Sequence, residues 1–435
     1  NPISIMENYH NQPKQGFFQS TTAKMIMVGL LTLVLLIPLF FVQDLISERS
    51  QRQKEVVAET TSKWGESVYF YGPILKIPYK NPITNQVENA FFFPEKLNNS
   101  SNTEIKAPLQ RSIYKSNVFT TKMQFEGFYA NPKFYKNNIP NENIYWDNAT
   151  IIIRTTNLKS VNDEVKIKIG ATNYTFEPKL NGTNNDSIQT LETGVVNYAA
   201  IKNNSFNLNI TYNGSRRISI VPIGKTTAAK MTSNWASPSF NGSFIPTDKK
   251  ITSTGFDASW KVSHFNRPFA QENFQSLPEL SKYAFAVDFI TPVDEYQQNE
   301  RASKYGFLVI GLTFLIFFLI QSISKINIHI FQYSMIGIAL IMFYTLLISI
   351  TEHSSFSFAY TIAGTSVVAL ISLYSISILK DKKFPTFIGI SLSVLYTFIY
   401  VIIQLEDYAL LVGSIGLFLI LASVMYFSRK IEWNK

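Results

Sequence analysis

The chain has 435 residues, a formal net charge of +9 and a mean hydropathy of only +0.05, and its apolar residues are concentrated in a few long runs. It has no cysteine, which excludes disulfides, zinc–thiolate sites and thiol nucleophiles. Its lysines and arginines are scattered, and several flank the apolar runs. We therefore attribute the positive charge to membrane lipid headgroups and topology, and expect no nucleic acid as a partner.

The first apolar run, Met25–Val42, is uncharged and long enough to cross a bilayer as a helix. It is similar to a signal peptide, but the next four residues offer no small-residue cleavage site. We interpret residues 23–42 as an uncleaved signal anchor and residues 1–22 as a cytoplasmic N-terminal segment. Residues 43–64 carry acid–base pairs four residues apart in the favourable order, which predicts a helical stalk beyond the membrane.

Residues 65–304 show a different pattern, in which alternating, β-branched and aromatic runs predominate. Asn-Gly pairs at Asn181, Asn213 and Asn241 separate several of these runs and are typical of turns between strands. The segment is long enough to bury a core of its own. We predict a large extracytoplasmic, mostly antiparallel β domain here.

Residues 305–428 hold five further apolar runs, none with Lys, Arg, Asp or Glu in its interior. Each is long enough to cross about 30 Å of hydrocarbon as a helix. We predict a membrane α-helical fold with one N-terminal span and a C-terminal five-helix block, followed by a cytoplasmic tail at residues 429–435. The five runs are Gly306–Ser324, Ile330–Ile350, Phe356–Leu379, Phe384–Ile403 and Ala409–Phe427.

The orientation of the spans follows from the charges of the short loops. Lysine precedes the first span at Lys24 and occurs in alternate loops, at Lys325 and at Lys382. The remaining short loops, Glu352–His353 and Glu406–Asp407, carry no lysine or arginine. By the positive-inside rule both termini are cytoplasmic, and residues 43–304 lie outside the cytoplasm.

The search for reactive chemistry is negative. Gly224-Lys225-Thr226-Thr227 resembles the end of a phosphate loop, but Ser219 stands where that motif needs its first glycine. His-Glu-x-x-His is absent, the chain has four histidines, and the five C-terminal runs lack the ionisable groups typical of ion pathways. We predict no catalytic residue, no metal ligand and no cofactor, and hence no enzyme.

Interaction candidates come from one aromatic-rich stretch and the turn after it. The stretch contains Trp235, Phe240, Phe244, Trp260, Phe265 and Phe269. These aromatics either pack in the sheet core or form a surface for a partner protein or glycan, with packing the favoured alternative. Trp235, Phe240 and Trp260 are the candidates taken from it. Asn266 and Arg267 precede a proline in a turn that we expect to be exposed. Arg267 is the preferred interface residue, since a charged group next to proline is seldom in a core.

The pair Glu352 and His353 lies at the outer end of a span and gives two more interaction candidates. Neighbouring residues on a helix point about 100° apart, so the two side chains do not form a metal-binding face. We interpret them as a loop that hydrogen-bonds to the adjacent domain or to headgroups, and keep a functional contact as the alternative.

Short segments such as Pro292-Val293-Asp294-Glu295-Tyr296 and Gln332-Tyr333 occur along nearly the whole chain, from about residue 24 to 428. Together, and in this order, they resemble the CreD family of bacterial inner-membrane proteins. The resemblance implies one N-terminal span, a large periplasmic domain and five further spans. It also implies a role in cell envelope integrity and envelope stress, with no established reaction. Gln321, Phe331, Asn234 and Ala236 depart from the family pattern. The matching segments include Tyr71-Gly72-Pro73-Ile74, Gly255-Phe256-Asp257-Ala258-Ser259-Trp260, Asn266-Arg267-Pro268-Phe269, Arg301-Ala302-Ser303-Lys304-Tyr305-Gly306 and Glu352-His353.

Together these observations predict a non-enzymatic inner-membrane protein that supports envelope integrity. It would bind another membrane or periplasmic protein through its β domain and helix block, in contact with membrane lipids. The alternative is a transporter or lipid-handling protein with a cavity between the β domain and the membrane helices.

Overall fold

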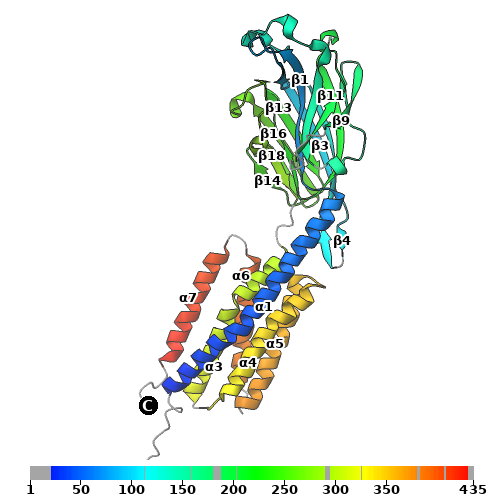
Figure 1. The fold of residues 1–435 in the computed structure, drawn as a ribbon. Coiled ribbons are helices and arrows are strands. Elements are labelled where there is room, and N and C mark those ends of the chain that lie inside the picture. The colour runs from blue at the N-terminus through cyan, green and yellow to red at the C-terminus, as the bar shows by residue number, and fades with distance from the viewer. Residues whose placement is uncertain are drawn as a thin grey trace, which may run out of the picture. The chain divides into compact units, whose positions relative to one another are not determined.

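The structure is a computed structural model in which α-helices and a large sheet occupy separate parts of the chain (Figure 1). It divides into a membrane unit, Asn1–Gln53 with Val293–Lys435, and a β unit, Lys54–Pro292. The described residues are 21–111, 113–156, 158–179, 188–201, 203–289, 294–324, 326–379, 383–405 and 408–429. Most of the predicted N-terminal segment and tail, the Asn181 turn, Lys325, Lys382 and the Glu406–Asp407 loop lie outside them.

Six described helices are long and apolar enough to cross a membrane, which confirms the predicted fold class. The first, α1, runs without interruption from Thr21 to Trp64 and contains Pro38. The last five are α3 (Gly306–Ser324), α4 (Ile330–Thr351), α5 (Phe356–Leu379), α6 (Lys383–Gln404) and α7 (Ala409–Ser428). A short polar helix, α2 (Glu295–Lys304), precedes them, and the Asp294 side chain caps it by accepting from Tyr296 N.

Helix α1 packs on the membrane unit through leucines that face glycines. Leu35 and Leu39 are 5% and 2% exposed. A Cβ added at Gly337 would lie 2.2 Å from Leu35 Cδ1, and one added at Gly306 would lie 2.7 Å from Leu39 Cδ1. The two glycines therefore give the leucine side chains the room to approach, as small residues do between membrane helices.

Gln321, which replaces the acidic residue that the family resemblance implies, is buried at the end of α3. Its Oε1 accepts a hydrogen bond from the Tyr333 hydroxyl on α4 at 2.8 Å. The neutral amide of Gln321 is accommodated at this buried position by the one hydrogen bond, whereas a buried carboxylate would need a charged partner.

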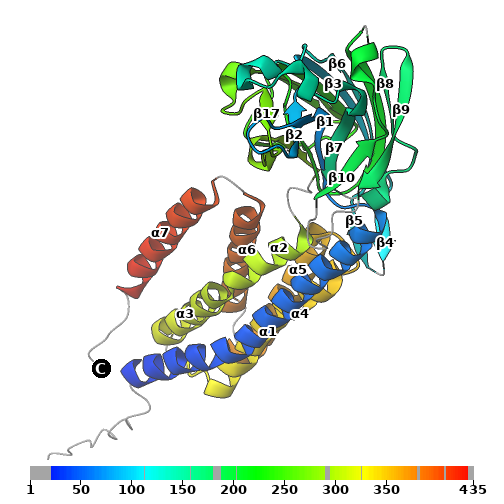
Figure 2. The ribbon, with the colours of Figure 1, turned by 45° about the horizontal axis from the view of Figure 1, so that its top comes forward.

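Sixteen described strands of the β unit belong to one hydrogen-bonded sheet, and Figure 2 shows β2 and β17 beside β1. All but two of the strand pairings are antiparallel, the exceptions being β1 with β12 and β3 with β13. Strand bounds are β1 Val68–Lys80, β2 Val87–Phe92, β3 Lys96–Ile105, β6 Phe119–Phe128, β7 Thr150–Thr156, β8 Lys166–Ile169, β9 Thr172–Lys179, β10 Ile188–Thr193, β11 Ser205–Gly214, β12 Arg217–Ile220, β13 Thr226–Ser233, β14 Ser239–Gly242, β15 Asp248–Thr252, β16 Gly255–Ser263, β17 Glu272–Phe274 and β18 Phe285–Asp288. A separate hairpin joins β4 (Leu109–Arg111) to β5 (Tyr114–Ser116).

The path of strands folds back on itself around a shared core. Strand β1 lies in its first half and β6 in its second, yet the Phe70 and Phe125 rings from these strands stack at 4.0 Å. Strand β6 alternates buried and exposed residues, as expected where one face of a strand meets the core. Strand β1 is buried along most of its length, because it has pairing strands on both sides and core against it.

Candidate functional site

The turn that follows β16 is a short 3-10 helix, η7 (His264–Asn266), which begins with a capping box between Ser263 and Asn266. Ser263 N donates to Asn266 Oδ1 at 3.1 Å, and His264 N donates to Lys225 O at 2.8 Å. The turn is thereby tied to itself and to the start of β13. Asn266 is exposed, as expected for an interaction candidate, and its side chain has a structural task as well.

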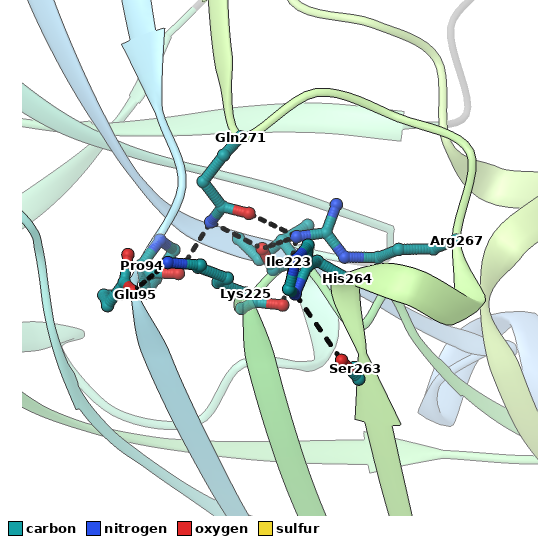
Figure 3. Close-up of polar contacts among 9 residues, drawn as sticks. Pro94, Glu95, Ile223, Lys225, Ser263, His264, Arg267 and Gln271 are labelled. Carbon is teal, nitrogen blue, oxygen red and sulfur yellow. Dashed lines mark hydrogen bonds and ion pairs between the residues drawn. The ribbon is translucent and has the colours of Figure 1, made fainter. Parts of the chain in front are cut away.

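Arg267 is buried, contrary to the prediction of an exposed interface residue, and is only 5% exposed. Its Nη1 donates to Phe269 O at 3.0 Å, and its Nη2 donates to Ile223 O at 3.2 Å, to Gly224 O at 3.1 Å and to the Gln271 side chain (Figure 3). The guanidinium also lies 4.1 Å from the centre of the Phe269 ring. The prediction was wrong because the two terminal nitrogens of the guanidinium find oxygen acceptors inside the domain, whereas its Nε has no hydrogen-bond partner among the described residues.

This buried cation has oxygen dipoles around it in place of a carboxylate. Burial lowers the pKa of Arg267 to about 10, so the group is still protonated at neutral pH. Gln271 joins the same network, since its Nε2 donates to Pro94 O at 2.7 Å and to Ile223 O at 3.2 Å. Nearby, Lys225 Nζ and Glu95 Oε1 form an ion pair at 2.5 Å. The network fastens three separate connections of the sheet together (Figure 3).

Phe265 belongs to the aromatic-rich stretch for which packing was the favoured alternative, and it was not chosen as an interaction candidate. Its side chain is 87% exposed although it sits in the middle of η7, and its ring centre lies 4.0 Å from that of His264. The signal available in the sequence was an aromatic residue between Ser263 and Asn266, two residues typical of turns. A large apolar side chain is thus presented to solvent on a turn whose backbone is held from both sides.

The three predicted aromatic candidates lie at different depths. Trp260 is 2% exposed and stacks on Phe285 with ring centres 4.8 Å apart, so the surface alternative is wrong for this residue. Phe240 is partly buried, with its ring 5.9 Å from that of Trp260. Trp235 is partly buried against the core, and its Nε1 donates to Ser237 O at 2.8 Å. These aromatics pack together because β14 and β16 supply adjoining faces of the core.

The pair Glu352 and His353 belongs to the membrane unit. Glu352 follows the last turn of α4, and its carboxylate lies 3.6 Å from Arg49 Nε on α1. His353 is exposed. The two predicted residues therefore diverge: Glu352 helps to hold α1 against α4, whereas His353 is available to solvent or headgroups.

The described residues contain no cluster of three or more histidine or acidic side chains that could hold a metal ion. Lys225, from the segment that resembles a phosphate loop, lies in the connection to β13 and is paired with Glu95. In its described part, the β unit therefore offers an exposed aromatic side chain on a turn held by hydrogen bonds, a feature suited to contact with another molecule. The membrane unit offers a bundle of membrane-length helices.

This architecture defines a class of protein: a multi-pass membrane protein with a large antiparallel β domain between its first and second spans. The sequence profile described as "Inner membrane protein CreD" matches residues 20–434. The chain belongs to the CreD family. It is 28% identical over 420 residues to the inner membrane protein CreD of Escherichia coli (strain K12), covering 92% of this chain and 91% of that protein. The chain is thus similar to an inner-membrane protein.

Solved structures resemble the chain only remotely. A mutant M1 zinc metallopeptidase from Deinococcus radiodurans has 7% identity and a TM-score of 0.23, over 49% of this chain and 53% of its own. A second structure of that metallopeptidase mutant, bound to a peptide substrate, has 8% identity and a TM-score of 0.22, over 79% of this chain and 95% of its own.

Proposed function

We propose that this chain is a non-enzymatic protein of the bacterial inner membrane that supports cell envelope integrity by binding another membrane or periplasmic protein. The observation that carries the proposal is Phe265, 87% exposed on a turn that the buried Arg267 network holds in place. Exposed aromatics on rigid supports are the residues that contribute most to protein–protein affinity, because they bury a large area at little cost in conformational entropy.

The proposed arrangement has both termini in the cytoplasm and residues 43–304 in the periplasm, so that the η7 turn meets envelope proteins. The lysine distribution among the short loops supports this orientation. A single cysteine introduced by Lys382→Cys should resist an impermeant thiol reagent in intact cells, and one introduced by Thr172→Cys should react once the outer membrane is permeabilised. The chain has no cysteine of its own to interfere. Labelling of a cysteine at position 382 in intact cells would contradict the proposed orientation.

The partner proposal is tested by replacing Phe265 with a photo-crosslinking phenylalanine analogue in the full chain. Tyr135 is the matched control, since it is an aromatic residue of the same unit, 70% exposed, on the separate 3-10 helix η2 (Phe134–Asn137). We expect a discrete crosslinked protein from position 265 and none from position 135. We also expect Phe265→Ser to lower recovery of that protein by about tenfold or more.

Equal crosslinking from both positions, or crosslinks within the chain alone, would contradict the proposal. A lone monomer or homo-oligomer on mild-detergent purification, without a partner protein, would instead favour the transporter or lipid-handling alternative.

A further inference from the structure

A long apolar groove lies within the membrane unit, between α3, α6 and α7, with a volume of about 750 Å³. Leucine, isoleucine, valine and phenylalanine make most of its walls, including Leu319 on α3, Phe387 on α6 and Ile420 on α7. None of its lining residues is acidic. A cavity of this lining in a bilayer is suited to hydrocarbon chains.

The groove exists because α7 packs on the rest of the bundle much less than the other spans. None of its described residues is buried, whereas half of the apolar window of α3 is buried. Its close approaches to α6 occur where it has glycines: added Cβ atoms would lie 3.7 Å from Ile402 at Gly413 and 2.1 Å from Phe398 at Gly416. Beyond Gly416 the two helices face each other across the groove.

The length of the groove is similar to the thickness of one leaflet of the bilayer. On α6 it extends from Lys383 to Phe398, which is about 22 Å at 1.5 Å per residue. On α7 it extends from Gly416 to Phe427, about 17 Å. One leaflet contributes about 15 Å of hydrocarbon to the bilayer core. An acyl chain that starts at the Lys383 end would therefore lie along the walls for its whole length.

The end of the groove at Lys383 is polar and basic. Lys383 begins α6, and Ser324 ends α3 on the facing wall. The Ser324 hydroxyl is buried and finds no hydrogen-bond partner among the described residues. Arg429 follows Phe427 by two residues, and its guanidinium lies 4.0 Å from the centre of the Tyr426 ring. Of these groups, the Lys383 cation and the unpartnered Ser324 hydroxyl line the groove, and they stand where the headgroup of a lipid in this groove would be.

We propose that the groove binds one anionic phospholipid, with its acyl chains against the walls and its phosphate beside Lys383 and Ser324. By the orientation given above, this lipid belongs to the cytoplasmic leaflet. The binding site involves no residue of the β unit and does not depend on the partner-binding proposal. Its specificity for anionic lipid comes from the basic end, and its affinity for lipid in general comes from the apolar walls.

The test is a native mass spectrometry titration of the full chain in mild detergent with dioleoyl-phosphatidylglycerol or dioleoyl-phosphatidylcholine. We expect one phosphatidylglycerol to bind about fivefold or more tightly than phosphatidylcholine, since a lysine near headgroups contributes about that factor. Lys383→Gln should reduce the preference about fivefold. Lys24→Gln is the matched control, a basic residue at the start of α1 that does not line the groove, and should leave the preference unchanged.

A second variant, Ser391→Phe, fills the groove from α6 and should lower the binding of both lipids. Equal affinity for the two lipids, or an equal effect of Lys383→Gln and Lys24→Gln, would overturn the proposal. It would also be overturned if Ser391→Phe left lipid binding intact and instead released a co-purifying membrane protein, because the groove would then hold a partner's helix. Circular dichroism and gel filtration of each variant establish that it is folded, and Lys383→Gln still decides the matter if Ser391→Phe is not.

Discussion

Arg267→Met removes the buried guanidinium while keeping a flexible side chain of similar length. Phe269 O loses its donor, Gly224 O retains only its bond from the Thr227 hydroxyl at 3.4 Å, and Ile223 O retains only its bond from Gln271. A hydrogen bond from a charged donor contributes about 1.5–3 kcal/mol. Three of the four bonds share the donor Nη2, so each is taken at the low end of that range, and together they amount to about 6 kcal/mol.

The opposing effect is the desolvation of the cation. Burial lowers the pKa of Arg267 to about 10, which corresponds to about 3 kcal/mol of destabilisation of the charged form. The hydrogen bonds therefore outweigh the burial, and the variant should lose about 2–3 kcal/mol. For a domain of this size that is a fall of roughly 5–10 °C in the melting temperature.

Tryptophan fluorescence measures this loss in the full chain, because the described tryptophans all lie in the β unit. The folded pKa lies below the unfolded one, so the cost of the charge is constant below about pH 10 and disappears only as pH rises further. We expect the same difference between wild type and variant at any pH from about 6 to 9. Faster hydrogen exchange over the η7 turn should accompany it.

Arg111→Met is the matched control, since Arg111 is half exposed and pairs with Glu59 at the surface at 2.6 Å. Such a pair contributes little to stability, because water screens it. A stability of Arg267→Met equal to or above that of wild type would show that the desolvation of the guanidinium outweighs its bonds. The account of the turn as a rigid support would then have to be abandoned.

Two further predictions concern single contacts. Burial raises the pKa of Glu192, but the ion pairs with Lys179 and Lys76, both near 2.7 Å, lower it more and bring it to about 2. Glu192→Gln should cost about 2 kcal/mol at neutral pH, and the difference from wild type should fade as pH drops from about 4.5 to about 2, as measured by urea unfolding. Gly337→Val should push Leu35 and α1 off the bundle and cost about 1–3 kcal/mol, seen as earlier loss of the gel-filtration peak on heating.

Each of these two predictions has a matched control variant, in which the same substitution is made at a position without the contact. Glu164→Gln removes a carboxylate that is 60% exposed, and its effect should be small at every pH. Gly311→Val adds the same side chain to a membrane helix where an added Cβ meets nothing within 4 Å. If Gly311→Val proved as damaging as Gly337→Val, the cause would be the backbone preference of valine and not the packing of Leu35.

Burial of polar residues was the part of the site that sequence reasoning misjudged. An arginine beside a proline is usually exposed, but whether its donors find acceptors depends on carbonyls at Ile223 and Gly224, more than forty residues away in the chain. Phe265, by contrast, is exposed, since its neighbours Ser263 and Asn266 close the turn by hydrogen bonds and leave its ring in solvent. Local pattern identifies the turn and does not say which of its side chains points inward.

The sequence by itself determined the six membrane-length helices and the division into helical and β-rich parts, because span length and strand alternation are local properties of the chain. The family followed from short motifs in order along nearly the whole chain. Only the tertiary structure decided that Arg267 is buried and bonds to distant carbonyl groups. The same holds for the pairing of Glu352 with Arg49 and for the groove that α7 leaves against α3 and α6. These depend on which distant surfaces meet, and uncharged apolar helices of similar composition carry little information about their packing partners.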